Sequence, residues 1–139
     1  MVKNLRVRGT DAELARLAAR VGRRLLARRR AVATAESCTG GWIAKALTDV
    51  AGSSQWFIEG FVTYSDAAKR QRLGVSRSVL KRHGAVSAAT VRAMARGALK
   101  RTAAQVAVAV TGIAGPGGGS AEKPVGLVHF AAAKMLSRH

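Results

Sequence analysis

The turn at residues 37–41, with the sequence SCTGG, combines two candidate nucleophiles with two glycines. It follows a short apolar segment at 31–36 that is typical of a buried strand, and it precedes a helical pattern. A strand, a tight turn and a helix in this order hold a reactive side chain beside backbone N–H groups that can stabilise an oxyanion. The sequence therefore indicates acyl-transfer chemistry here, with Thr39, Gly40 and Gly41 providing amides and allowing close approach of a substrate.

Two adjacent side chains compete as the nucleophile. Ser37 carries a suitable hydroxyl, but a serine at this position is also a common helix N-cap. Cys38 is its rival because a helix N-terminus lowers the pKa of a thiol. A lone cysteine is equally often a small buried side chain. Glu36 is the one acid beside the turn, and the residue types alone leave the nucleophile open.

Lys69 is the candidate general base for a hydroxyl nucleophile. Tyr64 ends an aromatic and β-branched segment at 56–64, and Lys69 lies in the first turns of the helix that follows. Strand ends and the next helix starts meet at one rim of an α/β sheet, where Ser37 is also expected. A lysine accepts a proton only when it is neutral, which requires burial or neighbouring positive charge. The alternative interpretation is an ordinary exposed lysine.

The glycine-rich segment at 112–120 is a candidate anion-binding loop. Successive glycine amides form nests that bind phosphate, so a phosphate-bearing substrate fits this segment. It lacks the Lys-Ser/Thr ending of a P-loop, and a flexible connection explains the composition as well. No His, Cys, Asp or Glu cluster has metal-ligand spacing, so neither a metal nor a cofactor is expected.

Length and composition predict one soluble domain. The chain has 139 residues, 48% of them hydrophobic, which is enough for a single core and too little for two domains. No apolar run approaches the ~18 residues that a membrane span needs. The single cysteine, Cys38, fits a reducing compartment, and a cytoplasmic location is expected.

The charge is strongly basic, with 24 Lys and Arg against 7 Asp and Glu and a net charge of +17. Such an excess favours contact with polyanions through phosphate neutralisation. However, the densest stretch, RRLLARRR at 23–30, ends a helical pattern where cations oppose the helix dipole. Aromatic residues are only 4%, which gives no stacking platform for single strands. The pattern favours a solvated basic surface over a specific nucleic-acid site.

Strands alternate with helices along the chain, which predicts a three-layer α/β/α sandwich with a mixed, mostly parallel sheet. Thr10 or Asp11 is the expected cap of the first helix. The final strand is expected to run from Pro124 to Ala133. The other expected strands cover 31–36, 56–64 and 105–112, and the expected helices cover 11–29, 42–51, 66–73, 76–82 and 88–102.

Four long motifs in order closely resemble the CinA C-terminal domain family, whose stand-alone members are nicotinamide-nucleotide amidases. The resemblance covers the chain from about Thr10 to Ala131. The motifs are TAESCTGGWIAKALTDVAGSS at 34–54, GFVTYSDAAKRQRLGV at 60–75, HGAVS at 83–87 and VTGIAGPGGGSAEKPVGLVHFA at 110–131.

The resemblance implies a reaction and its catalytic residues. The family hydrolyses the carboxamide of nicotinamide mononucleotide to nicotinate mononucleotide and ammonia, without a metal. The serine of its ESCTGG motif falls on Ser37, and the tyrosine and lysine of its TYS-x-x-x-K motif fall on Tyr64 and Lys69. The implied mechanism is attack by Ser37 on the amide carbon, with Lys69 and Tyr64 handling the proton.

The resemblance also implies a substrate site formed by the nucleophile turn and the glycine-rich loop. Amides at the start of the helix after Ser37 are expected to hold the oxyanion. The loop is expected to place amides near the ribose or phosphate. The expected substrate-binding residues are Glu36, Thr39, Gly40, Gly41, Thr111, Gly112, Gly115, Gly117, Gly118 and Gly119.

The two ends of the chain depart from the family pattern. Relatives continue past the VGLVHFA strand with another strand, an arginine-bearing turn and a closing helix, whereas this sequence ends in AAKMLSRH. One sheet edge is therefore expected to be unpaired or completed by another subunit, in a homo-oligomer. Residues 1–9 are expected to form a flexible extension of a single domain over 1–139. The alternative function is a catalytically silent, basic relative that binds nucleotide or nucleic acid.

Overall fold

A computed structural model describes residues 9–136, so the flexible extension expected over residues 1–9 lies outside the described residues except for Gly9. The helices are α1 (Asp11–Ala27), α2 (Trp42–Thr48), α3 (Asp66–Leu73), α4 (Arg77–His83) and α5 (Ala88–Arg101), with a short 3-10 helix, η1 (Ser53–Gln55). The strands are β1 (Val32–Glu36), β2 (Phe57–Val62), β3 (Val106–Gly112) and β4 (Val128–Lys134). No helix within 9–136 has the length and apolar character needed to cross a membrane.

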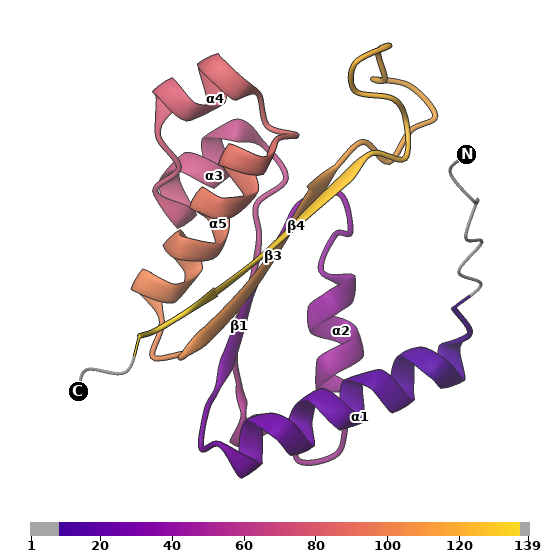
Figure 1. Cartoon of the computed structure of the whole chain (residues 1–139), viewed down its shortest axis with the longest axis vertical. Coiled ribbons are helices and arrows are strands. Elements are labelled where there is room, and N and C mark those ends of the chain that lie inside the picture. The colour runs from indigo at the N-terminus through magenta and orange to yellow at the C-terminus, as the bar shows by residue number, and fades with distance from the viewer. Residues whose placement is uncertain (1–8, 137–139) are drawn as a thin grey trace.

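The four strands form one mixed sheet in the order β2-β1-β3-β4. β1 pairs in parallel with both β2 and β3, and β4 runs antiparallel to β3. In Figure 1, α3, α4 and α5 lie on one side of the sheet, and α1 and α2 lie on the other. The predicted three-layer sandwich with a mostly parallel sheet is confirmed.

Both faces of the sheet carry an apolar core. On the α5 side, Met94 and Ala98 pack against the small side chains of β1 and β3. On the α1 side, the fully buried Trp56 fills the space between the helices and the start of β1. All five residues of β1 are buried, as expected for a central parallel strand covered on both faces. β1 is therefore the buried central element that carries the turn at residues 37–41 at its carboxyl end.

Side-chain caps begin four of the helices. Thr10 caps α1 in a reciprocal capping box with Glu13, as predicted. Ser65, Ser76 and Ser87 each accept a hydrogen bond from a backbone N–H in the first turn of α3, α4 and α5. These serines fix where each helix starts, and in α3 this start determines the position of Lys69.

Two element boundaries predicted from the sequence were wrong by three or more residues. α2 ends at Thr48 instead of running to residue 51, because Val50 and Ser53 donate to carbonyls three residues back rather than four and Gly52 adopts a left-handed φ of 81°. β4 begins at Val128 instead of Pro124. A turn closed by a Leu127 N–H to Pro124 carbonyl hydrogen bond of 3.0 Å precedes the strand.

Close packing between α5 and the end of α3 depends on Gly97, because a methyl group there would overlap the Leu73 carbonyl oxygen. Alanine favours a helix over glycine by about 1 kcal/mol, but overpacking costs about 1–3 kcal/mol. We therefore expect Gly97→Ala to lower the free energy of unfolding in urea titrations. Gly117→Ala is the matched control, because no atom lies within 4 Å of a Cβ at that position, and it is expected to be neutral. Equal stability of the two variants would contradict the packing argument.

Candidate active site

Ser37 lies directly after β1, at the carboxyl-terminal rim of the sheet. Its backbone N–H donates to the Val110 carbonyl at 3.1 Å, and its carbonyl accepts from the Gly40 N–H at 3.0 Å. Gly40 and Gly41 have φ angles of 62° and 102°, so the turn requires glycine at both positions. The result is a tight turn that leaves Ser37 only 6% exposed.

Lys69 reaches the same point from α3. Long side chains on helices extend toward the helix N-terminus, which here lies beside the end of β2. The Lys69 Nζ lies 3.0 Å from the Ser37 Oγ. It also donates to the backbone carbonyls of Thr63 at 2.9 Å and Tyr64 at 3.0 Å. The structure thus brings Ser37 and Lys69 together at the rim where both were expected.

The surroundings of the Lys69 amine determine how it binds a proton. Its side chain is 1% exposed. Burial lowers the pKa of the Lys69 amine, while the negative charge of Asp66 opposes the shift. A neutral amine has two N–H donors and one lone pair. In the charged form the amine donates to both carbonyls and to the Ser37 Oγ; once it is neutral, the two carbonyls take its two N–H groups and the lone pair is left to accept from the Ser37 hydroxyl. This geometry suits a general base acting on Ser37.

The thiol of Cys38 is in an environment that suppresses its reactivity. Burial raises the pKa of the Cys38 thiol, outweighing the lowering effects of nearby backbone N–H groups and of Lys69. The sulfur packs toward Gly112, where an added Cβ would lie 3.1 Å from Sγ. The expectation that the helix terminus lowers the pKa of this thiol was therefore wrong, because desolvation is the larger effect.

Glu36 has a different role from the expected contact with substrate. Its side chain is 0% exposed, and its carboxylate accepts from the Ile43 N–H at 2.7 Å, the Ala44 N–H at 3.0 Å and the Thr39 hydroxyl at 2.8 Å. These bonds also occupy the Ile43 and Ala44 amides in the first turn of α2, whereas the Thr39, Gly40 and Gly41 amides expected at the oxyanion lie before the helix. The predicted contact of Glu36 with substrate is therefore corrected: the buried carboxylate needs donors, and the helix start supplies them.

Tyr64 contacts the site through its backbone. Its carbonyl accepts from the Lys69 amine, whereas its phenol side chain is 69% exposed and makes no hydrogen bond within residues 9–136. Proton handling by the phenol stays a prediction. Thr63 was missed from the sequence, although its carbonyl is one of the two acceptors that orient Lys69. Its place just before Tyr64, at the end of a strand, was the available signal.

The expected loop residues divide into packed and open positions. Thr111 is buried, and its hydroxyl donates to the Ala85 carbonyl at 2.9 Å. Added Cβ atoms at Gly112, Gly115 and Gly119 would overlap neighbouring atoms, so these glycines allow the loop to fold closely on itself. Gly117 and Gly118 are exposed and have open space around them. Contact between this loop and a nucleotide stays a prediction.

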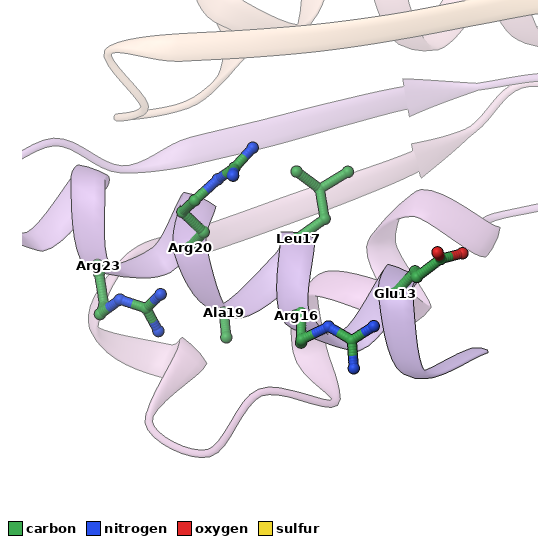
Figure 2. A pocket seen from close by; sticks show the side chains of 6 residues that line it. All are labelled: Glu13, Arg16, Leu17, Ala19, Arg20 and Arg23. Carbon is green, nitrogen blue, oxygen red and sulfur yellow. The ribbon is translucent and has the colours of Figure 1, made fainter. Parts of the chain in front are cut away.

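A surface hollow of about 490 Å³ lies along α1, away from the Ser37 site. Figure 2 shows Arg16, Arg20 and Arg23 around it, together with Leu17 and Glu13. These three arginines are exposed, and the single ion pair within residues 9–136 joins Lys45 to Asp49. The hollow is cationic and contains none of the residues of the Ser37 site.

Comparisons with known proteins agree on one family. The family model described as the CinA C-terminal domain matches residues 14–138. The nicotinamide-nucleotide amidohydrolase PncC of Escherichia coli K12 is 60% identical over 122 residues, which cover 88% of this chain and 74% of that protein. A CinA-like protein of Akkermansia muciniphila is 66% identical over 99 residues, covering 71% of this chain and 24% of that protein.

Solved structures give the same result for the fold. The competence/damage inducible protein of Agrobacterium tumefaciens aligns with a TM-score of 0.87 and 56% identity, covering 91% of this chain and 75% of that chain. The competence damage-inducible protein A of Klebsiella pneumoniae aligns with a TM-score of 0.84 and 45% identity, covering 87% of this chain and 75% of that chain.

Proposed function

Since the chain belongs to the CinA C-terminal domain family, we propose that it hydrolyses nicotinamide mononucleotide to nicotinate mononucleotide and ammonia, in the cytoplasm and without a cofactor. The observation that carries the proposal is the 3.0 Å contact between the Ser37 hydroxyl and a buried lysine amine. The substrate follows from relatives named nicotinamide-nucleotide amidohydrolase at 60% identity.

The first half of the proposed reaction is acyl transfer to Ser37. The serine oxygen attacks the carboxamide carbon while the Lys69 amine takes the hydroxyl proton. The same proton then passes from Lys69 to the leaving nitrogen, the C–N bond breaks and ammonia departs. An ester between Ser37 and the nicotinate mononucleotide acyl group remains. Water attacks this ester with Lys69 again accepting a proton, which releases the acid and restores the serine.

The developing oxyanion needs hydrogen-bond donors other than the first amides of α2. The Gly41 N–H makes no hydrogen bond within residues 9–136, and the Cys38 and Thr39 N–H groups interact only with the weakly accepting Cys38 thiol. They belong to the same turn as Ser37, so they are the donors available beside the attacked carbonyl. We assign the oxyanion site to this turn, which contains the Thr39 and Gly41 amides expected for it from the sequence.

Two further roles complete the proposal. The exposed phenol of Tyr64 exchanges a proton between the site and solvent, beside the amine that its own carbonyl orients. The open amides of Gly117 and Gly118 bind the phosphate of the nucleotide, as a nest of glycine N–H groups does. A homo-oligomer, in which a second copy completes the β4 edge of the sheet, remains part of the proposal.

Ammonia release from nicotinamide mononucleotide by the purified chain tests the proposed function. We expect ammonia and nicotinate mononucleotide in equal amounts, with the products separated by chromatography. Free nicotinamide is the matched control, because it has the same carboxamide without the ribose and phosphate, and it is expected to react far more slowly. A folded protein that releases no ammonia from the nucleotide contradicts the proposal.

The alternative, a silent relative that binds nucleic acid, is favoured by the exposed arginines of α1 (Figure 2), which make no ion pair within residues 9–136. If the basic residues of the chain mainly form a solvated surface, binding of the protein to labelled duplex DNA should be weak and independent of the DNA sequence. We expect it to fall at least about tenfold between 50 and 200 mM salt, because counterion release drives it. Fluorescence anisotropy measures this binding. Tight, salt-resistant and sequence-selective binding would favour the alternative over the enzyme.

A further inference from the structure

The start of α2 has no cap of its own. Its N-cap residue is Gly41, which has no side chain to accept a hydrogen bond from the first turn. The first N–H groups of any helix need acceptors from outside the helix. Here the Glu36 carboxylate takes that place: one oxygen accepts from Ile43 at 2.7 Å and the other from Ala44 at 3.0 Å. The acceptor thus comes from the residue immediately before the nucleophile.

Glu36 also makes hydrogen bonds to the middle of the turn and to the segment that follows the neighbouring strand β2. The Thr39 hydroxyl donates to the Glu36 carboxylate at 2.8 Å, so the middle of the turn is tied to it. The Glu36 carbonyl accepts from the Thr63 N–H at 2.8 Å. The Thr63 carbonyl in turn accepts from the Lys69 amine at 2.9 Å. One residue therefore connects the turn that carries Ser37 with the segment that orients Lys69.

Glu36 does this without touching the reacting groups. Its side chain is 0% exposed, which leaves no surface for a substrate. All of its side-chain hydrogen bonds within residues 9–136 go to the turn and to α2. Three donors and no acceptor face its two oxygens, so the site is built for a carboxylate. A glutamine amide would place an NH₂ group against an N–H or O–H donor and lose at least one of these bonds.

We propose that Glu36 is a positioning residue: its buried carboxylate fixes the nucleophile turn on α2 and so keeps the Ser37 hydroxyl on the Lys69 amine. The inference rests on the proposed function, because it gives Glu36 a part in the reaction of that site. A displacement of the nucleophile by about 1 Å costs on the order of 100-fold in rate, so loss of this anchor affects kcat. Substrate binding by other groups is unaffected.

Steady-state kinetics on nicotinamide mononucleotide test the proposal with Glu36→Gln, Glu36→Asp and the control Glu59→Gln. Glu59 is an exposed acid on β2, so its variant removes the same charge without removing the anchor. We expect Glu36→Gln to lower kcat about 100-fold with KM within threefold of wild type. Glu36→Asp keeps a carboxylate with shorter reach, and we expect it to lose only about tenfold in kcat. Glu59→Gln should match wild type.

A second readout separates this inference from the substrate assignment. A fluorophosphonate reacts with an activated serine, forming an O–P bond as fluoride leaves, and intact mass follows the labelling of Ser37. We expect Glu36→Gln to be labelled about 100-fold more slowly than wild type. If the wild-type protein is labelled but does not hydrolyse nicotinamide mononucleotide, the proposed substrate is wrong. The role of Glu36 is then still tested by comparing the labelling rates of Glu36→Gln and wild type. Labelling and kcat at wild-type levels in Glu36→Gln would overturn the inference. If that variant does not fold, wild-type kcat in Glu36→Asp overturns it.

Discussion

Replacing Ser37 with alanine is expected to lower kcat for nicotinamide mononucleotide by about 10⁴-fold or more. The hydroxyl supplies the oxygen of the acyl ester and is the group that contacts the Lys69 amine, whereas partial burial raises the pKa of the neighbouring Cys38 thiol and disfavours its thiolate. Thermal unfolding should change little, because the Ser37 side chain makes one hydrogen bond, to Lys69. Ammonia release under saturating substrate measures the loss.

Cys38→Ala is the matched control for this prediction. It removes the adjacent nucleophile from the same turn and leaves the backbone N–H in place. We expect its kcat to stay within about threefold of wild type, since a small apolar side chain suits the packing toward Gly112. Full activity in Ser37→Ala, or a loss confined to Cys38→Ala, would make the thiol the nucleophile.

Replacing Lys69 with arginine or methionine is expected to lower kcat about 10³-fold, which is typical of removing a general base. Arginine keeps a positive charge but does not lose its proton in any practical pH range. The arginine variant should therefore be about as inactive as Lys69→Met, whereas a lysine needed only for its charge would tolerate arginine. Near-normal turnover in Lys69→Arg would assign the base to another group.

The lowered pKa of Lys69 also sets the direction of the pH dependence. The neutral amine is the active form, so kcat should rise with pH as Lys69 loses its proton, at a pH below the ordinary ~10.4. Between the lowered pKa and ~10.4 the unfolded chain holds a proton that the folded chain has lost. The free energy of unfolding therefore rises with pH in that window. Lys69→Met should lack this rise in urea titrations at several pH values.

The sequence predicted the elements that carry the site better than the contacts within it. Ser65 capping α3, the apolar run of β1 and the two glycines after Ser37 are local signals, and each determines backbone geometry within a few residues. The parallel pairing of β1 with β2 then brings the two strand ends together. The meeting of Ser37 and Lys69 at one rim was therefore predictable from local patterns and one topological rule.

The protonation chemistry and the role of Glu36 were not predictable in this way. Whether burial or the helix terminus has the larger effect on the pKa of Cys38 depends on its packing against Gly112 of β3, which is 112 − 38 = 74 residues away in the sequence. Glu36 carries the charge of a substrate-binding residue, and only the fold shows its carboxylate turned away from the site into the start of α2. Long-range packing decides both questions, and a sequence pattern does not contain it.

The pH dependence of Ser37 labelling by a fluorophosphonate, followed by intact mass, tests most directly whether a buried neutral lysine activates this serine. The expected result is a single label that maps to Ser37. Its rate should rise with pH as one proton is lost, with a midpoint below the ordinary lysine pKa of ~10.4, and the rise should be absent in Lys69→Met. A label on Cys38, or a Ser37 labelling rate in Lys69→Met equal to that of wild type at every pH, would contradict activation of Ser37 by Lys69.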